Sequence, residues 1–244
     1  DSLSKWSEDW QMFLSLPKCF SYRMGAGPPA SYVLNGQALR AENFGPVRDL
    51  GVLIDRRLKF SDHIQSQIEK AERMAGIIRR SFRNSQSVTM AKAFAIYATP
   101  FFEFGSNVFN SLSAEDSNRL EKVQKDFTRS VFKICHFPSA SYEERLAALG
   151  LQDLKTRRHQ LDLGFVHSVA SGKHFCPPCK PSTQPSAYAL RNTSRLIPDR
   201  NPVGPRRSCL INRVAASWNA LPADSAQISH RTFFDRLNSH SNKQ

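Results

Sequence analysis

The sequence predicts a mainly α-helical protein with a small α/β part at its N-terminus, and three observations support this fold class. Between residues 61 and 172, apolar side chains recur every three or four positions, which is the period of amphipathic helices. Residues 1–60 instead contain short β-type runs separated by Gly, Pro and Asn, a pattern typical of strands and turns. Residues 173–207 are rich in Pro, Ser and Arg, which indicates a loop or an extended arm.

The N-terminal part is expected to begin with a short helix. Within residues 2–16, Trp6, Trp10 and Phe13 lie near helical spacing, so they would share one face. Pro17 would end this helix, because proline lacks the backbone N–H that a helix interior requires.

Three strand-type segments follow: residues 18–24, residues 31–39 and residues 47–55. The second segment, SYVLNGQAL, predicts a hairpin, because Asn35-Gly36 favours a two-residue turn with positive φ at both positions. The third segment, VRDLGVLID, is expected to form a further strand with Gly51 at its centre. A glycine inside a strand indicates a bulge or a close approach of another backbone.

Five helices are predicted between residues 61 and 172. Ser61 is the expected N-cap of the first helix. The apolar stripe of that helix consists of Ile64, Ile68, Ala71, Ala75 and Ile78. The second helix begins near Ser87, and Pro100 is expected to kink or end it. Its inward-facing residues are Ala91, Phe94, Ala95 and Ala98.

The third and fourth helices begin with capping-box sequences, in which a serine is followed three residues later by an acidic residue. These pairs are Ser113 with Asp116 and Ser141 with Glu144. Gly150 would end the fourth helix, and the fifth is expected over residues 153–172. The apolar stripe of the third helix consists of Leu120, Val123, Phe127, Val131 and Ile134.

Two more helices are expected after the arm. One lies in SCLINRVAASWNALP, residues 208–222, and the last begins near Ser229. Trp218, Phe233 and Phe234 lie at helical spacing, which favours a place in the core over a place in an interface.

The charge balance favours a polyanionic partner. The formal net charge is +13 in 244 residues, and an excess of this size favours nucleic acid before a membrane surface. A generally basic solvated surface is the alternative interpretation. The chain contains no run of about 18 apolar residues, so we expect no membrane-spanning segment.

The opening segment and the cysteines suggest where the protein works. DSLSKWSEDW is not basic-then-apolar and does not begin with Met, so we expect no signal peptide and expect a piece of a longer chain. Five scattered Cys residues, an odd number, favour reduced thiols. We therefore expect an intracellular protein of the cytoplasm and nucleus, and the sequence does not indicate an oligomeric state.

Two groups of basic residues are candidates for binding phosphates one by one. Three arginines close the first helix: Arg79, Arg80 and Arg83. Four cations lie on about one face of the third helix, opposite much of its apolar stripe: Arg119, Lys122, Arg129 and Lys133. The alternative is ordinary solvated helix surface, where cations near a C-terminus are favourable.

A possible zinc site lies in the arm, where His174, Cys176 and Cys179 form the pattern H-x-C-P-P-C. A pair of Cys two residues apart suits zinc, and Cys209 or His167 could complete a tetrahedral site. Incidental cysteines in a loop are the alternative, because no second close pair is present.

Six segments carry a likeness to a known family, and they follow one another along nearly the whole chain. They are WSEDWQMFLSLPKC (6–19), VRDLGVLIDRRLKFSDHI (47–64), YATPFFEFGSNVFN (97–110), RLEKVQKDFTR (119–129), SYEERLAALGLQDLKTRRHQLDL (141–163) and SCLINRVAASWNALPADSAQISHRTFFDRL (208–237). Together they resemble the region after the catalytic Asp-Asp turn of non-LTR (LINE-type) retrotransposon reverse transcriptases, especially the jockey group. Phe104 and Phe109 depart from the pattern, because the family often has Tyr and Trp there.

This resemblance implies a domain organisation. Residues 1–58 would be the end of the palm, with partial palm hairpins, residues 59–150 the helical thumb, and residues 151–244 a helical C-terminal extension. Leu50, Gly51 and Val52 would form the primer grip, a hairpin element that positions the 3′ end of the primer. Without the resemblance, a buried strand with a glycine bulge is the preferred interpretation of this segment.

The resemblance also implies what the chain would do and what it would lack. Lys18 would match a palm lysine near the phosphates of the incoming nucleotide. The catalytic aspartates that hold Mg²⁺ in the intact polymerase are absent, so we expect no catalytic residue, no resident cofactor and no polymerisation by this chain alone. Its expected partner is an RNA–DNA template–primer hybrid. The alternative is a non-enzymatic basic helical module that binds nucleic acid or a partner protein.

Overall fold

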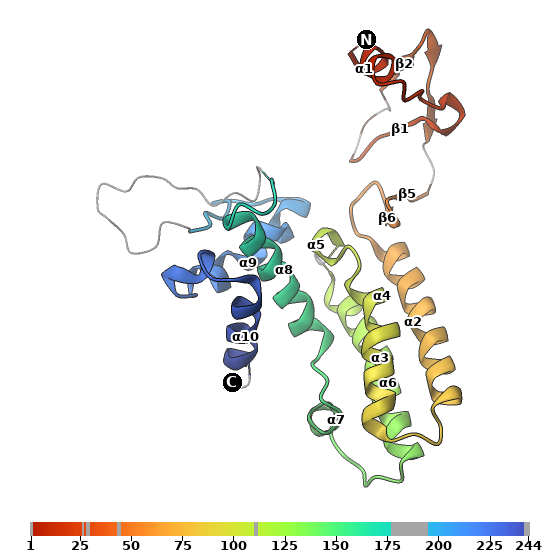
Figure 1. The fold of residues 1–244 in the computed structure, drawn as a ribbon. Coiled ribbons are helices and arrows are strands. Elements are labelled where there is room, and N and C mark those ends of the chain that lie inside the picture. Colours follow the sequence, from red (N-terminus) through yellow and green to blue (C-terminus); the bar gives the residue numbers. More distant parts are fainter. Residues whose placement is uncertain are drawn as a thin grey trace. The chain divides into compact units, whose positions relative to one another are not determined.

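The protein is mainly helical, with short strands near its N-terminus (Figure 1), which confirms the predicted fold class. The computed structural model describes residues 2–25, 27, 30–42, 45–109, 112–176 and 195–241. The chain divides into two compact units, Asp1–His63 and Ile64–Gln244. None of the helices in the described ranges has the length and apolar character needed to cross a membrane. The functional boundaries near residues 58 and 150 stay predictions.

The first helix is shorter than predicted. α1 (Ser2–Asp9) covers only the first part of residues 2–16. Gln11 has a φ of 53°, which a helix does not permit. The hydroxyl of Ser7 donates to the carbonyl of Met12 at 2.6 Å and holds the chain in this turn. Local side-chain bonding of this kind competes with helix propagation.

The strands of the first unit form three separate two-stranded pairs. The first pair is parallel, and the second is an antiparallel hairpin. Their bounds are β1 (Phe20–Tyr22) with β4 (Arg40–Glu42), and β2 (Val33–Leu34) with β3 (Gln37–Ala38). Asn35 and Gly36 have φ values of 50° and 76°, so the predicted Asn-Gly turn is confirmed.

Residues 47–55 form a hairpin, so the prediction of one strand with a central glycine is wrong. β5 (Val47–Asp49) pairs antiparallel with β6 (Val52–Ile54). Leu50 and Gly51 form the turn, with φ values of 43° and 91°. Both values lie in the left-handed region, which glycine adopts without strain. Gly51 is therefore required by the turn, and the alternative of a buried strand with a glycine bulge is also wrong.

All five helices predicted between residues 61 and 172 are present. The second is divided at Pro100, which lies in the first turn of α4. Ser61 is the first residue of its helix and not the residue before it, a difference of one position. The bounds are α2 (Ser61–Ser81), α3 (Ser87–Tyr97), α4 (Thr99–Glu103), α5 (Ser106–Phe109), α6 (Ala114–Ile134), α7 (Tyr142–Leu149) and α8 (Leu154–Ala170).

Apolar stripes on α2, α3 and α6 form the core of this helical part. The predicted stripe of α2 is buried along its whole length, and so is that of α6 up to Val131. Phe94 of α3 stacks on Phe127 of α6 with ring centroids 4.2 Å apart. Each ring is at most 1% exposed, so this aromatic pair lies at the centre of the packing between α3 and α6.

The predicted helix ends are confirmed where local chemistry decides them. Ser113 accepts from the N–H of Asp116, and Ser141 with Glu144 forms a complete capping box. Gly150 ends α7 with a φ of 64°, which glycine tolerates best. These signals involve residues at most four positions apart, so they do not depend on tertiary contacts.

The C-terminal segments pack on α8. α9 (Leu210–Asn219) and α10 (His230–Ser241) both contact α8, as Figure 1 shows for α8 and α10. Two short 3-10 helices precede them: η3 (Gly204–Ser208) and η4 (Ala223–Ala226). Trp218 and Phe233 are each 2% exposed, and Phe234 packs against their cluster, so their prediction as core residues is confirmed. Most of the predicted arm, residues 177–194, lies outside the described residues.

Two polar contacts fasten α9 to its surroundings. Arg213 forms a two-point ion pair with Asp162 of α8, with Nε and Nη2 each 2.8 Å from a carboxylate oxygen. Asn219 binds both backbone groups of Leu196, accepting from the N–H at 3.0 Å and donating to the carbonyl at 2.9 Å. Such part-buried polar contacts fix one arrangement of the elements that they join.

A buried histidine makes this C-terminal packing sensitive to acid. His167 of α8 is fully buried, stacks on Phe233 at 4.4 Å and donates from Nε2 to the carbonyl of Ile228 at 3.1 Å. Burial lowers its pKa, the Ile228 carbonyl opposes this shift, and His230 and Lys173 add to it.

We expect stability to fall as the pH drops below about 6.5. The folded state favours neutral His167, whereas the unfolded chain binds a proton more readily. The stabilisation that comes from neutral His167 is therefore complete above the pKa that this histidine has in the unfolded chain. It is lost as the pH falls towards the lower pKa of His167 in the folded state. Urea midpoints at neutral and mildly acidic pH measure it. His167→Gln should flatten this pH dependence, whereas His136→Asn, at an exposed position, should not. Equal slopes in both variants would contradict this assignment.

Candidate nucleic-acid interface

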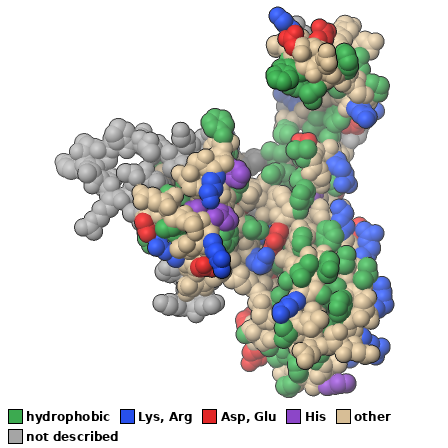
Figure 2. All heavy atoms as spheres, viewed as in Figure 1, with side chains coloured by type: hydrophobic (Ala, Val, Ile, Leu, Met, Phe, Trp, Pro, Cys, Tyr) green, Lys and Arg blue, Asp and Glu red, His purple; other side chains and the backbone are tan. Residues whose placement is uncertain are grey.

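The structure brings the two predicted basic groups together, because α2 and α6 lie side by side. Arg79 of α2 donates from Nη1 to the hydroxyl of Ser130 on α6 at 3.2 Å. Near the other end, Arg119 of α6 donates to the side chain of Gln65 on α2. The two helices therefore run in the same direction. Figure 2 shows several Lys and Arg side chains on the side where α2 lies.

Three of the predicted phosphate contacts already have acidic partners on their own helix. Arg119 pairs with Asp116 at 3.0 Å. Lys122 and Arg129 both pair with Asp126, each at 2.7 Å. These neighbours are three or four positions apart, the spacing at which side chains meet on a helix surface.

Asp126 sits between its two cations and keeps its negative charge. A hydrogen bond from Lys122 is the largest cause that lowers the pKa of Asp126, and Arg129 lowers it further. The same bond raises the pKa of Lys122. The positive charge in the middle of the predicted basic stripe on α6 is therefore partly neutralised. Exposed ion pairs of this kind add little to the stability of the fold.

The ends of α2 and α6 carry the least compensated positive charge. We define the cationic end as Arg79, Arg80, Arg83, Arg129 and Lys133. Within the described ranges, Arg80, Arg83 and Lys133 take part in no ion pair, and all three are exposed. Cations at helix C-termini also stabilise the helices themselves, so the cluster alone does not require a ligand.

Leu50 and Gly51, two of the three residues predicted as the primer grip, form the tip of the β5–β6 hairpin, and Val52 is the first residue of β6. Leu50 is 91% exposed, whereas Val52 is buried. The hairpin is held from below by Tyr22, whose hydroxyl donates to the carbonyl of Ile54 at 3.1 Å. The tip of the hairpin is therefore exposed to solvent, while the strand behind it is held by the bond from Tyr22. The role of the tip at a primer end stays a prediction.

The loop after this hairpin is organised by Asp55, a residue that sequence reasoning did not single out. Its carboxylate accepts from the N–H of Arg57 at 2.8 Å and from the N–H of Phe60 at 2.6 Å. Phe60 has a φ of 60° and is buried. Asp side chains often accept hydrogen bonds from backbone N–H groups a few residues later in the chain, and this tendency of Asp55 is the sequence signal that could have indicated the loop.

Lys18, the predicted accessory phosphate contact, ends the short 3-10 helix η1 (Leu16–Lys18). Its side chain is exposed. Pro17 lies in the first turn of η1, so the proline that was expected to end a long helix instead begins this short one. The role of Lys18 stays a prediction.

The possible zinc ligands are only partly described. His174, Cys176 and Cys209 belong to no group of three or more potential metal ligands in the part of the chain that the structure describes. His174 instead stacks on Phe165 with centroids 6.4 Å apart. Cys179 lies outside the described residues, so the zinc hypothesis stays a prediction.

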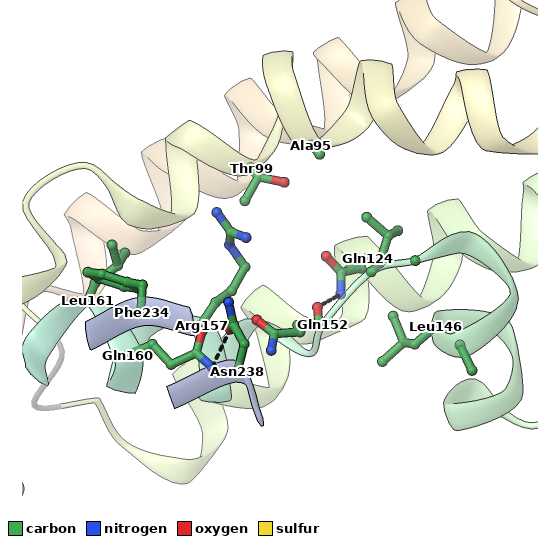
Figure 3. A pocket seen from close by; sticks show the side chains of 13 residues that line it. Ala95, Thr99, Gln124, Leu146, Gln152, Arg157, Gln160, Leu161, Phe234 and Asn238 are labelled. Atoms are coloured by element: carbon green, nitrogen blue, oxygen red, sulfur yellow. Dashed lines mark hydrogen bonds between the residues drawn. The ribbon is translucent and has the colours of Figure 1, made fainter. Parts of the chain in front are cut away.

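Four amide side chains line one cavity of about 620 Å³ in the second unit, and sequence reasoning missed them. We call it the amide pocket (Figure 3). Its amides are Gln124, Gln152, Gln160 and Asn238. The available signal was weak: Gln124 and Gln160 are 1% and 7% exposed, and a buried amide on a helix requires polar partners.

Comparisons with known proteins give two partial similarities. The chain is 29% identical over 154 residues to an uncharacterized protein of Caenorhabditis elegans, which covers 63% of this chain and 73% of that protein. It is 27% identical over 140 residues to the RNA-directed DNA polymerase from mobile element jockey of Drosophila melanogaster, which covers 54% of this chain but 15% of that polymerase. No protein-family model and no solved structure matches the chain.

Proposed function

We propose that this chain is a C-terminal part of the RNA-directed DNA polymerase of a non-LTR retrotransposon, and that it binds template–primer nucleic acid. The observation that carries the proposal is the partial similarity to the jockey polymerase over 140 residues. The net charge of +13 and the cationic end support it, because each cation that neutralises a phosphate releases counterions. Localisation in the cytoplasm and nucleus would follow from this role.

The chain alone would hold nucleic acid without extending a strand. Mg²⁺ is implied for the intact polymerase, where it would neutralise charge on the transferred phosphate. The described residues do not fit that ion, because they contain no group of three or more potential ligands. Asp126 and Asp116, the carboxylates nearest the cations of α6, are engaged in ion pairs. No polymerisation step is therefore assigned to these residues.

The bound duplex would contact the cationic end through its phosphates. Arg80 in the last turn of α2, Arg83 just after that helix and Lys133 in the last turn of α6 are all exposed. Neighbouring cations of this kind would contact successive phosphates. Such contacts position a duplex and carry no sequence information. Binding should therefore depend strongly on salt and weakly on sequence.

Replacement of Arg80, Arg83 and Lys133 by glutamine is the direct test. Binding to an RNA–DNA hybrid is measured over a range of salt concentrations. We expect weaker binding to every hybrid sequence alike, and the slope of log K against log salt should flatten by about 1 for each lost phosphate contact. A wild-type slope near zero would end the proposal.

A matched control separates this surface from overall charge. Arg195, Arg200 and Arg231 are exposed and lie outside α2 and α6. Their replacement by glutamine removes the same formal charge and should leave the slope nearly unchanged. If both triple variants lost the same affinity and the same salt slope, the overall charge would govern binding and the cationic end would not.

The alternative function is a non-enzymatic module that docks a partner protein. Docking through Trp218 and Phe233 conflicts with the structure, because both rings are 2% exposed within the α8–α10 core. Capture of a protein partner that survives nuclease treatment would favour this alternative, and it would require a different surface.

A further inference from the structure

The amide pocket has the size of a ligand site and is built from distant parts of the second unit. Its lining comes from α3, α4, α6, α7, α8 and α10. A volume of about 620 Å³ falls within the usual range of small-ligand pockets. No residue of this pocket belongs to the cationic end.

The pocket is close to electrically neutral. Arg157 is its one charged lining residue among those described, and its Nε donates to the carboxylate of Glu103. A free phosphate or a carboxylate would therefore meet no uncompensated cation here. The lining favours a neutral ligand that presents both donors and acceptors.

The amides differ in how much of their bonding capacity is already used. Gln124 donates to the hydroxyl of Tyr142 at 3.0 Å and to the carbonyl of Gln152 at 2.8 Å, so it is held in place. Gln160 donates to Oδ1 of Asn238 at 3.3 Å, which turns the donor group of Asn238 away from that bond. Figure 3 shows the contact from Gln124 to Gln152 and the contact from Gln160 to Asn238.

Two amide groups are left for a ligand. Among the described residues, the side-chain amide of Gln152 and the Nδ2 group of Asn238 make no hydrogen bond. The Gln152 amide offers a donor and an acceptor, and Nδ2 of Asn238 offers a donor. One side-chain amide recognises the N6 and N7 edge of adenine by accepting from N6 and donating to N7.

An aromatic ring completes the lining. Phe234 of α10 lies against Gly164 of α8, where an added Cβ would come within 2.5 Å of its ring tip. Gly164 thus allows the ring to approach the backbone of α8. Unpaired bases are bound in proteins by aromatic rings together with hydrogen bonds to base edges.

We propose that the amide pocket binds an unpaired nucleobase, with adenine as the preferred base. This inference rests on the proposed function for its biological setting, because a template–primer has single-stranded template beyond the duplex. The cationic end would hold the duplex phosphates, and the amide pocket would hold one base of the single strand.

A direct binding experiment tests the pocket without any duplex. Adenosine is titrated into the full chain while the side-chain amide signals are followed by NMR. The signals of Gln152 and Asn238, assigned by their loss in Gln152→Ala and Asn238→Ala, should shift with adenosine and not with ribose. Unchanged signals would overturn the proposal, whatever the outcome for hybrid binding.

A second experiment tests the pocket in its setting. An RNA–DNA hybrid with an adenine overhang is compared with one whose overhang has the same phosphates but no bases. The adenine overhang should bind roughly tenfold more tightly, since stacking and contacts to one base commonly give that much or more. The double variant Gln152→Ala/Asn238→Ala should lose this advantage and keep the salt slope of the blunt hybrid.

The outcomes separate the two proposals. Equal affinity of the wild type for both overhangs, with a steep salt slope, overturns the amide pocket and leaves the proposed function. A flat salt slope with adenosine-dependent shifts overturns the proposed function and leaves the pocket as a nucleobase site.

Discussion

Replacement of Asp162 by alanine is expected to destabilise the second unit by about 3–5 kcal/mol. Asp162 is fully buried and Arg213 is 15% exposed at the side chain, so the change leaves a buried guanidinium without its carboxylate. Arg213 would keep its contacts to the carbonyls of Ser208 and Asn107, which limits the loss. Urea unfolding followed by the helical circular dichroism signal measures the effect.

The exposed pair of Arg236 and Asp224 is the matched control. It has the same chemistry, with side chains 41% and 49% exposed. Asp224→Ala should cost less than about 1 kcal/mol, because water replaces the lost partner. If Asp162→Ala and Asp224→Ala lowered the free energy of unfolding by similar amounts, burial of the Asp162–Arg213 pair would not explain its contribution to stability.

Replacement of Phe127 by alanine is expected to cost about 3–5 kcal/mol. The ring is 1% exposed and stacks on Phe94, so its removal leaves a cavity between α3 and α6. Because α6 also carries Arg129 and Lys133, the variant should lose hybrid binding only where its helices have unfolded. Unfolding midpoints and binding measured over the same temperatures test this link.

Phe104 provides the comparison for this prediction. Its side chain is 55% exposed, so Phe104→Ala should change stability by no more than about 0.5 kcal/mol. If Phe127→Ala were equally mild, the packing between α3 and α6 would not be the centre of this core.

Much of the helical part could be predicted because its signals are local. The stripe that begins at Ile64, the capping box at Ser141 and the end at Gly150 each depend on residues within one or two turns. The pairing of Lys122 and Arg129 with Asp126 is also local, and its spacing could have been recognised. Sequence reasoning missed it because the basic residues were counted without the acidic residue between them.

The errors in the first unit have a different cause. The residues by themselves did not indicate the turn at Leu50-Gly51, because leucine rarely adopts a positive φ and the dipeptide is not a usual turn signal. Only the family resemblance implied a hairpin element there. The helix ended near Asp9 because Ser7 bonds the carbonyl of Met12, a contact that periodicity does not reveal. In both places a specific backbone bond or turn prevailed over the general pattern.

The sequence by itself determined which segments are helical, where most helices begin and end, and that the protein carries a large positive charge. It also carried the likeness that led to a polymerase hypothesis. Only the tertiary structure decided which side chains meet: Arg79 with Ser130, Asp162 with Arg213, and the amides of one pocket. The reason is physical, because helix signals arise between neighbours in the chain, whereas these contacts join residues that only packing brings together.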